Sequence, residues 1–351
     1  MADSATAELN PLTPQRLFHM MAGFKATAVL RTGVSLGVFD AVADAPLTAA
    51  ELAGRLGLAP RGARALTGAL AGAGLLAEHD GGRYGLPPGG AELLVTTSPR
   101  YCGGIVDVAC STGEWTALGV LARTVREGGP LPGRDALGPG FDYWVDFATH
   151  TTFGTRRGAE LLADALDPYL AETEAPRVLD AACGHGLFGY EIAARHPDAR
   201  IVSQDWPEVL EVAEGHAKRQ GVRDRVAYLP GDVERVDLGG PYDVVVVANL
   251  LFHLGAERAA RLVERLAGLL APGGRLAVVG FTAGDAPAVE QEHAHLLGLL
   301  MLSWTDGGEM HSTADYRAML AGAGLTEADH HSRPGLPLSA LIGRRPSAVS
   351  S

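Results

Sequence analysis

The chain has 351 residues, a formal net charge of −12 at pH 7 and a 47% share of hydrophobic residues. This length predicts two domains, or one large domain with an accessory domain. The negative charge argues against a polyanionic partner, because nucleic-acid affinity comes mainly from Lys and Arg side chains that neutralise phosphates.

The cysteines and the N-terminal residues indicate the compartment. Cys102, Cys110 and Cys183 form no Cys-x-x-Cys pair and no even set, so they favour neither a disulfide framework nor a cysteine zinc site. The stretch "MADSATAELNPLTPQ" lacks the charged start and apolar core of a signal peptide, and no later run approaches the ~18 apolar residues of a membrane span. We therefore expect a soluble, cytoplasmic protein that does not enter a membrane.

The first domain is predicted over residues 1–100, where short helices are followed by a small hairpin. The stretch "LTAAELAGRLGLAP" is typical of a Thr-capped helix, and the segment after it predicts a second helix and a turn at Asp80, Gly81 and Gly82. Helix, turn, helix and hairpin are the outline of a winged-helix module. Such a module can read DNA, but these residues carry eight basic and eight acidic side chains, and a DNA reader needs a basic stripe. We therefore expect this domain to serve dimerisation or packing.

Residues 101–170 are predicted to be a helical linker that helps to form a binding pocket. A Gly- and Pro-rich loop, "EGGPLPGRDALGPG", interrupts the linker, which holds much of the scarce aromatic supply. Aromatic faces pack between domains or line a pocket for a flat ligand, and both interpretations stay open. The residues concerned are Trp115, Phe141, Trp144, Phe147 and Phe153.

Residues 171–345 alternate between strand and helix patterns. The run "VVVVA" is typical of a buried parallel strand, which is apolar throughout. The predicted fold class is α/β, with a Rossmann-like, doubly wound sheet after the mostly helical first domain. Pro272, Gly273 and Gly274 are expected to stop the last of the helices. The expected strands are 177–183, 199–205, 225–232, 242–252 and 274–281, and the expected helices are 189–196, 207–221 and 256–270.

A glycine-rich turn follows the first of these strands. Gly184, Gly186 and Gly189 match Gly-x-Gly-x-x-Gly, and Asp205 follows at about the spacing of a ribose-binding acid. Such glycines bring the backbone close to a ligand and open a helix N-terminus, a geometry that serves several nucleotide cofactors. The turn alone is therefore compatible with a nicotinamide or flavin site.

Two further acids change this assignment. Asp180 lies inside the strand, where a dinucleotide-binding fold usually has an apolar residue and where a carboxylate could meet a cationic group of the ligand. Asp232 ends the third strand, within reach of an adenine edge if the ligand occupies the usual crevice at the strand ends. Both positions suit a nucleoside that carries positive charge.

Together with these acids, five motifs resemble those of class I S-adenosylmethionine-dependent methyltransferases. More narrowly, the chain resembles the small-molecule O-methyltransferases of bacteria and plants that carry an N-terminal winged-helix dimerisation domain, and the resemblance covers nearly the whole chain. It implies S-adenosylmethionine as the cofactor, a small-molecule acceptor and a homodimer formed through the N-terminal domain. The motifs are "VLDAACGHG" at 178–186, "QDWP" at 204–207, "PGDV" at 230–233, "APGGRL" at 271–276 and "YRAMLAGAGL" at 316–325.

The resemblance also implies the roles of the cofactor-binding residues. The glycine loop approaches the methionine part of the cofactor, the acid after the second strand binds the ribose hydroxyls, and the acid of "PGDV" contacts adenine. The acid inside the first strand supports the loop. The residues expected on this basis are Asp180, Gly184, Gly186, Asp205, Trp206, Asp232, Val233 and Asn249.

The catalytic positions depart from the family pattern. In the resembled family a His after the fourth strand is the general base, but the segment "NLLFHL" places Phe252 at that position and His253 one residue later. Two carboxylates that orient the base are also replaced, one near Gly280 or Phe281 and the other by Met310. His253 is the candidate catalytic residue that remains.

Three hypotheses about the reaction stay open. In the first, which we favour, His253 acts as base or hydrogen-bond donor in O-methylation of an aromatic or polyketide-like metabolite. In the second, an acidic or electron-rich carbon needs little help from a base and is C-methylated. In the third, the fold binds S-adenosylmethionine but catalyses a rearrangement, decarboxylation or cyclisation. A separate hypothesis, from a different functional class, is a winged-helix regulator that senses a metabolite. The expected acceptor contacts are Trp144, His150, Phe252, Met301 and Met310.

Several histidines raise the question of a metal. His293 and His295 are two apart on a predicted helix and point about 200° away from each other, so they cannot chelate as a pair. One of them could join His253 or His311 across the pocket. The other expected states are surface or core histidines, and we assign no metal.

Overall fold

The computed structural model describes residues 11–130 and 136–347, and the chain forms two compact units. The smaller unit ends at Trp115 and the larger unit begins at Thr116. The segment predicted as a linker is thus divided between the two units. No helix among the described residues is long and apolar enough to cross a membrane.

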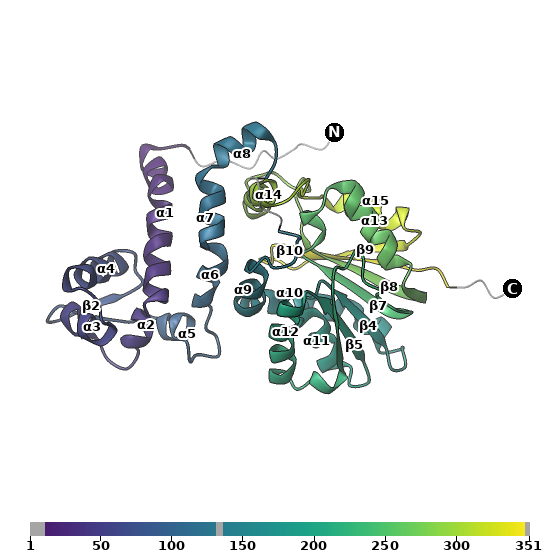
Figure 1. The fold of residues 1–351 in the computed structure, drawn as a ribbon, viewed down its shortest axis with the longest axis horizontal. Helices are drawn as coiled ribbons and strands as arrows, with labels where there is room; N and C mark the ends of the chain where they lie inside the picture. The colour runs from purple at the N-terminus through teal and green to yellow at the C-terminus, as the bar shows by residue number, and fades with distance from the viewer. Residues whose placement is uncertain (1–10, 131–135, 348–351) are drawn as a thin grey trace. The chain divides into compact units, whose positions relative to one another are not determined.

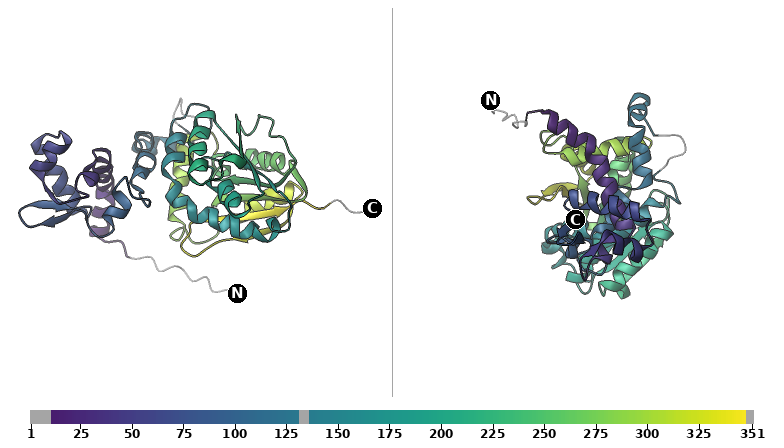
Figure 2. Two further views of the ribbon diagram at one scale, coloured as in Figure 1. Left: turned by 90° about the horizontal axis from the view of Figure 1, so that it is seen from below. Right: turned by 90° about the vertical axis from the view of Figure 1, so that its left-hand side faces the viewer.

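The smaller unit has the helix, turn, helix and hairpin that the sequence predicts. Its elements are α1 (Pro14–Ser35), α2 (Val38–Ala41), β1 (Leu47–Thr48), α3 (Ala49–Leu56), α4 (Pro60–Gly72), β2 (Ala77–His79), β3 (Arg83–Gly85), α5 (Gly90–Leu94), η1 (Gly103–Ile105), α6 (Val106–Ala109) and the first residues of α7 (Thr112–Gly119). Helix α3 begins at a capping box, in which the Thr48 hydroxyl accepts the Glu51 N–H and the Glu51 carboxylate accepts the Thr48 N–H. Gly81 and Gly82 turn the hairpin, and both have positive φ. Figure 2 shows this unit from two directions.

The larger unit contains a seven-stranded sheet in the order β6-β5-β4-β7-β8-β10-β9. Strands β4 to β8 are parallel, whereas β10 runs antiparallel to both of its neighbours. This arrangement confirms the Rossmann-like, doubly wound class. The helices are α8 (Leu121–Glu127), α9 (Tyr143–His150), α10 (Thr152–Leu170), α11 (Leu187–Arg195), α12 (Pro207–Arg219), α13 (Ala256–Ala267), α14 (Glu292–Trp304) and α15 (Thr313–Gly322), with 3-10 turns η2 (Arg223–Arg225) and η3 (Leu251–His253). The strands are β4 (Arg177–Ala181), β5 (Arg200–Asp205), β6 (Val226–Pro230), β7 (Tyr242–Ala248), β8 (Leu270–Phe281), β9 (Thr326–His331) and β10 (Leu338–Arg344).

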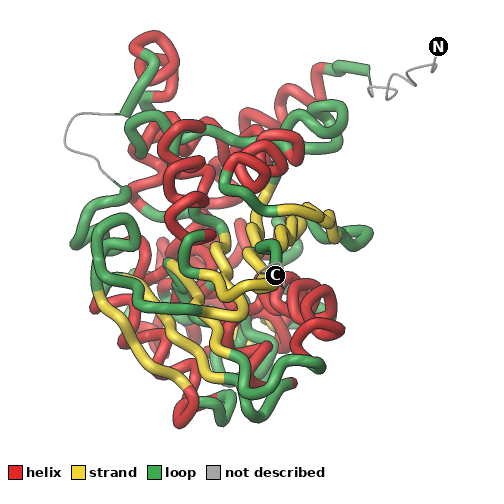
Figure 3. Tube along the Cα trace, turned by 90° about the vertical axis from the view of Figure 1, so that its right-hand side faces the viewer, coloured by secondary structure: helices red, strands yellow, loops and turns green. Residues whose placement is uncertain are grey.

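Two apolar cores lie on the two faces of this sheet. Side chains alternate along a strand, so Val178 of β4 enters one core and Leu179 enters the other. Helices α10, α11 and α12 cover the first face, and α13 and α15 cover the second, as Figure 1 shows. Figure 3 shows the strands in yellow among the helices in red. Burial on both faces leaves the carboxyl ends of β4, β5, β6 and β7 as the edge where a ligand can enter.

The strand predicted over 242–252 is too long by four residues. Strand β7 ends at Ala248, because Asn249 adopts a left-handed conformation with φ of 53° that a strand cannot continue through. A short 3-10 turn follows and contains both Phe252 and His253. The left-handed residue therefore turns the candidate catalytic segment away from the sheet.

The helix predicted to stop at Pro272, Gly273 and Gly274 ends earlier, at Ala267. The Leu269 carbonyl accepts the N–H of Tyr242, and the next residue is already paired with the start of β7. Pairing with β7 therefore draws the chain into β8 before the proline is reached. The prediction was wrong because a long-range pairing, which the local sequence does not show, sets this boundary.

Candidate functional site

The glycine turn connects β4 to α11 at the carboxyl edge of the sheet. Gly184 and Gly186 have φ of 54° and 77°, in the left-handed region that favours glycine. A Cβ on Gly186 would lie 2.3 Å from the Tyr190 ring, so only glycine fits there. The Gly184 N–H donates to Asp205 Oδ2 at 2.7 Å, which ties the turn to the end of β5.

Asp205 is the acid that faces this turn. Its Oδ1 accepts the Trp206 N–H at 2.7 Å, so each carboxylate oxygen receives one backbone N–H. Each oxygen keeps a further lone pair, which a ligand hydroxyl could use. Burial raises the pKa of Asp205 to about 6, although the two N–H groups favour the charged form.

Asp180 supports the turn from inside the sheet. Its side chain is fully buried, and its Oδ2 accepts the Gly189 N–H in the first turn of α11 at 3.0 Å. Its Oδ1 is buried and has no hydrogen-bond partner among the described residues. Burial raises the pKa of Asp180 to about 7, and the charge of Asp205 adds to that rise.

Two more polar positions lie at the carboxyl ends of β6 and β7, the strands that flank β5 and β4 in the sheet. After β6, Asp232 Oδ1 accepts the Glu234 N–H at 2.9 Å and Oδ2 lies 3.3 Å from Arg235 Nε. The adjacent Val233 packs against the apolar core below α13. After β7, Asn249 Oδ1 is buried and lacks a hydrogen-bond partner among the described residues. A buried acceptor without a partner is costly, so a ligand donor at this position would stabilise it.

His253 lies next to this edge and is 4% exposed. Its Nδ1 is 3.2 Å from the Leu250 carbonyl, an acceptor, so in the neutral ring Nδ1 carries the proton and Nε2 is the unprotonated nitrogen. Burial lowers the pKa of His253 to about 4, although nearby backbone carbonyls favour the charged form. The Phe252 ring stacks on the imidazole with centroids 4.7 Å apart, and the Trp144 ring meets it edge-on at 5.1 Å.

An aromatic box surrounds these rings. Trp304 is 1% exposed, and its ring makes edge contacts with Phe141 at 5.6 Å and with Tyr143 at 4.7 Å between centroids. The Trp144 Nε1–H donates to the Ala136 carbonyl at 2.6 Å, which fixes the indole beside His253. The box comprises Phe141, Tyr143, Trp144, Phe252, Phe281, Leu297, Leu300, Met301, Trp304 and Met310, together with Ala117 and Ala136.

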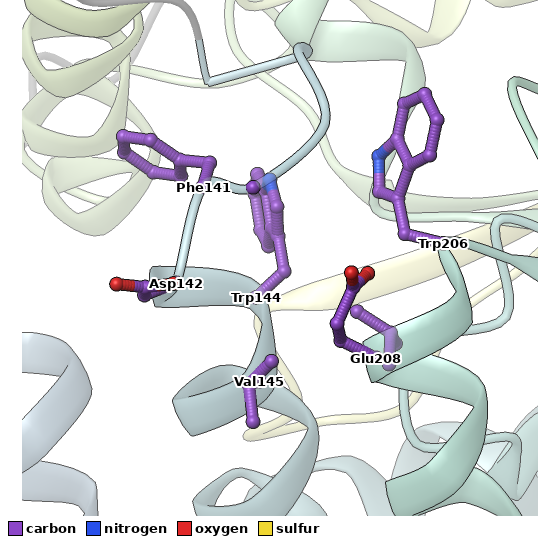
Figure 4. Close-up of a pocket in the computed structure, with 8 residues that line it drawn as sticks. Phe141, Asp142, Trp144, Val145, Trp206 and Glu208 are labelled. Atoms are coloured by element: carbon purple, nitrogen blue, oxygen red, sulfur yellow. The ribbon is translucent and has the colours of Figure 1, made fainter.

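A small open pocket of about 80 Å³ lies between the N-terminal ends of α9 and α12. In Figure 4 the Trp144 and Trp206 side chains lie on opposite sides of it, and the Glu208 carboxylate lies between them. Ordinary ligand pockets exceed roughly 300 Å³, so the described side chains leave only a narrow opening here. The pocket is lined by Gly140, Phe141, Asp142, Trp144, Val145, Trp206, Glu208 and Val209.

Comparisons with known proteins agree with this geometry. A model of the O-methyltransferase dimerisation domain matches residues 18–96, and a model of a methyltransferase domain matches residues 178–274. Over 350 residues the chain is 31% identical to acetylserotonin O-methyltransferase of Mus musculus, covering 94% of this chain and 88% of the relative. The chain belongs to the O-methyltransferase family. It is an S-adenosylmethionine-dependent methyltransferase, and S-adenosylmethionine is its cofactor.

Two further matches extend along nearly all of the methyltransferase. It is 27% identical to the tetracenomycin polyketide synthesis 8-O-methyl transferase TcmO of Streptomyces glaucescens, covering 95% of this chain and 97% of the relative. A crystal structure from Nostoc punctiforme, assigned to the O-methyltransferases, superposes with a TM-score of 0.85 at 28% identity. That superposition covers 95% of this chain and all of the other.

The structure of the methyltransferase brings most of the predicted acceptor contacts together. Trp144, Phe252, Met301 and Met310 belong to the aromatic box, and His150 is the last residue of α9.

Two of the aromatic residues that the sequence analysis names, Trp115 and Phe153, are not members of the aromatic box. Trp115 belongs to the smaller unit, where the Arg31 guanidinium lies 5.7 Å from its ring. Phe153 lies in the first turn of α10 and is 44% exposed. Composition locates aromatic residues along the chain but does not say which of them share a face.

Sequence reasoning missed Trp304 and Gln204. A usable signal existed for Trp304, because it follows Met301 by three residues on a helix and therefore shares its face. No local pattern marks Gln204, whose side chain bonds to two turns from different parts of the chain.

The histidines considered as metal ligands are dispersed in the methyltransferase. His311 Nε2 lies 3.2 Å from the Leu251 carbonyl and 3.1 Å from the Leu254 carbonyl, so this nitrogen carries a proton. His293 and His295 are exposed on α14. Within residues 11–130 and 136–347, no group of three or more His, Cys, Asp or Glu side chains is placed to hold a metal ion.

Proposed function

We propose that this enzyme transfers the methyl group of S-adenosylmethionine to a hydroxyl oxygen of a small aromatic or polyketide-like metabolite. The observation that carries the proposal is the aromatic box beside His253, a cluster of largely buried rings that places apolar faces next to one polar nitrogen. TcmO, by its name, is an 8-O-methyl transferase of polyketide synthesis, and the mouse relative is named for acetylserotonin. Both names describe O-methylation of a molecule that would suit such faces.

The residues at the strand ends fit the cofactor that the family uses. Asp205 has lone pairs for ribose hydroxyls, and Asn249 Oδ1 and Asp180 Oδ1 are buried acceptors without partners among the described residues. Acidic side chains also favour a cofactor that carries a sulfonium and an ammonium group. We assign the cofactor site to Asp180, Gly184, Gly186, Asp205, Trp206, Asp232, Val233 and Asn249.

When bound, the cofactor supplies an electrophilic methyl group, and the chain must orient the acceptor and receive its proton. His253 Nε2 is the nitrogen available to accept a hydrogen bond from the acceptor hydroxyl. A phenol has a pKa of about 10, so full transfer of its proton to a group with a pKa of about 4 costs about 8 kcal/mol. His253 therefore orients the hydroxyl and accepts the proton as the O–C bond forms, and the site suits hydroxyl groups more acidic than phenol.

Replacement of His253 by Gln is expected to lower kcat by about 10²-fold or more, because an amide cannot accept the proton. The loss should be smallest for the most acidic acceptor hydroxyls, whose proton needs the least help. Steady-state kinetics over a series of hydroxyaromatic acceptors with increasing pKa measures how the loss of kcat depends on the pKa of the acceptor. A His295→Gln variant is the matched control, since His295 is an exposed histidine of α14 outside the box. Equal losses for acidic and weakly acidic acceptors would contradict a proton-accepting role.

The affinity for S-adenosylmethionine is expected to fall about tenfold between pH 7 and pH 5. Asp205 has a pKa raised to about 6, so it is ionised at pH 7 and protonated at pH 5. Protonation removes negative charge from the cofactor site and occupies a lone pair that a ribose hydroxyl would use. Calorimetric titration at several pH values measures the dissociation constant. An affinity that rises toward pH 5 would contradict the assigned role of Asp205.

C-methylation is the second candidate, and one observation favours it. Phe252 occupies the position where the family has its base, and its ring lies 3.6 Å from the point where a Cβ on Gly280 would be. An enolisable or electron-rich carbon needs less help from a base than a phenol does. Products made with ¹³C-methyl cofactor distinguish the candidates by NMR, because methoxy and carbon-bound methyl signals differ. Product formation without S-adenosylhomocysteine would instead support a non-methylating reaction.

The smaller unit supports assembly into a homodimer. Helix α1 has large apolar side chains that remain exposed, with Phe18 at 67% and Phe24 at 64%. Met20 and Met21 are exposed beside them. Contiguous apolar surface of this kind marks interaction sites, and the dimerisation model of the family covers this helix. We propose that a second copy of the chain covers α1.

A further inference from the structure

Gln204 is a buried residue near the end of β5 that contacts both turns of the cofactor site. Its side chain is 1% exposed, and its Oε1 accepts the Ala182 N–H at 3.1 Å. Its Nε2 donates to the Gly231 carbonyl. One amide group therefore joins the start of the glycine turn to the turn that carries Asp232.

The two turns need such a connection because their strands are not neighbours. Strand β5 lies between β4 and β6, so no ladder of the sheet joins the turn after β4 to the turn after β6. Both joined groups also belong to unusual backbone, since Ala182 has φ of 51° and Gly231 has φ of 138°. Neither residue continues a strand, and each depends on a side chain for a hydrogen bond.

The main chain of β5 reinforces the same connection. The Gln204 carbonyl accepts the Cys183 N–H at 2.9 Å, and the Asp205 carbonyl accepts the Gly231 N–H at 3.0 Å. The amide orientation of Gln204 follows from its partners, because the reversed amide would place its NH₂ group against the Ala182 N–H. Gln204 thus uses one N–H and its carbonyl oxygen in these two hydrogen bonds.

We propose that Gln204 is a positioning residue for the cofactor. Its amide fixes the separation between the glycine turn, assigned to the methionine part, and the Asp232 turn, assigned to adenine. Gln204 acts through these turns and is not assigned a contact of its own. The inference rests on the cofactor site proposed above.

The test is a Gln204→Met variant, which keeps the length of the side chain and removes both hydrogen bonds. The dissociation constant for S-adenosylmethionine, measured by calorimetry, is expected to rise about 10- to 50-fold, because two backbone groups lose their partners. At saturating cofactor, kcat and the KM for the acceptor should stay within about threefold, because the aromatic box is built from other elements.

A Tyr242→Phe variant is the matched structural control. The Tyr242 hydroxyl is buried and donates to the Leu238 carbonyl at 2.6 Å, at the opposite end of the sheet. Its loss should lower the melting temperature and leave cofactor affinity within about twofold. If Gln204→Met also lowers only the melting temperature, Gln204 is a structural residue and the proposal is overturned.

A Gln204→Glu variant adds a second measurement, the pH dependence of cofactor affinity, which would not change if Gln204 had a purely structural role. Protonated glutamic acid has one donor and one acceptor, as glutamine has, whereas the ionised form places a charged oxygen against the Gly231 carbonyl. The ratio of its dissociation constant to that of the wild type should therefore shrink as the pH falls. A ratio that stays constant with pH overturns the proposal even if the Met variant does not fold. Wild-type protein that binds no S-adenosylmethionine would contradict the proposed cofactor site instead.

Discussion

Gly186→Ala is expected to lower the free energy of unfolding by about 2–4 kcal/mol, whereas Gly184→Ala should lower it by about 1 kcal/mol. Both glycines have left-handed φ, so both variants share the backbone cost of a Cβ in that region. They differ in the space around the new atom. A Cβ at Gly186 would lie 2.3–2.5 Å from three atoms of Tyr190, while a Cβ at Gly184 would meet nothing within 4 Å.

Tyr190 cannot move aside to relieve this overlap. Its side chain is 0% exposed and packs in the core between α11 and the sheet, where space is already filled. Overlap in such a core forces the backbone of the turn to shift, which costs roughly 1–3 kcal/mol beyond the backbone term. Because the shifted backbone is the turn assigned to the cofactor, we also expect S-adenosylmethionine binding to weaken more in Gly186→Ala than in Gly184→Ala.

Urea denaturation of the two variants measures the difference. A Tyr190→Leu change should partly rescue Gly186→Ala, so the double variant should be less destabilised than the sum of the single changes. The same change should not rescue Gly184→Ala. Equal destabilisation by the two glycine variants would contradict the view that Tyr190 sets the shape of this turn.

The sequence predicts which strand ends share one edge of the sheet because the signals for strands and turns are local. Each parallel strand ends in a short turn, and parallel strands place their carboxyl ends at the same edge of the sheet. It follows that Gly184, Asp205 and Asp232 lie near one another once the strands are recognised. The hydrogen bond from the Gly184 N–H to Asp205 directly joins the ends of two such strands, β4 and β5.

The remaining features depend on contacts between distant segments. Strand β7 ends where Asn249 turns left-handed, and α13 ends at Ala267, shortly before Leu270 pairs with Tyr242. Trp304 joins the aromatic box from a helix that lies more than 150 positions after Phe141 in the sequence. Propensity and periodicity describe single elements, so they do not predict these contacts.

For His253, too, the sequence predicts one part and the structure is needed for the rest. The resemblance to the family implies that Phe252 stands at the position of the usual base, which raises the question of what His253 can do. Only the structure shows that His253 is buried, that its Nδ1 faces the Leu250 carbonyl and that its pKa falls to about 4. Burial by Trp144 and Phe252, rather than residue type, makes this histidine a weak base.

Asp205→Asn is expected to weaken S-adenosylmethionine binding by about 10²- to 10³-fold at pH 7. The carboxylate now serves two backbone donors, the N–H groups of Gly184 and Trp206, with one oxygen each. Asparagine has only one oxygen, so its NH₂ group would face one of these donors and leave it unpaired. Loss of a charged acceptor costs about 1.5–3 kcal/mol, and the misaligned turn adds to this cost.

Asp243→Asn is the matched control for this loss. Asp243 Oδ2 also accepts a backbone N–H from a neighbouring strand, that of Arg177 at 2.8 Å, but it lies at the start of β7 and away from the cofactor edge. Its replacement should lower stability and leave the dissociation constant for S-adenosylmethionine within about twofold. A comparable loss of affinity in both variants would mean that general destabilisation, and not the lost carboxylate, weakens binding.

The pH dependence of the affinity for S-adenosylmethionine distinguishes the contribution of the Asp205 charge from that of the hydrogen-bond geometry of its side chain. Wild-type affinity should fall toward pH 5 as Asp205 gains a proton, because its pKa lies at about 6. Asparagine does not titrate, so the affinity of Asp205→Asn should change less over the same range. The ratio of the dissociation constant of Asp205→Asn to that of the wild type should therefore fall by about tenfold from pH 7 to pH 5. If the ratio of the two dissociation constants does not change with pH, the charge on Asp205 does not contribute to cofactor binding. The asparagine variant would then lose affinity only through the distorted turn.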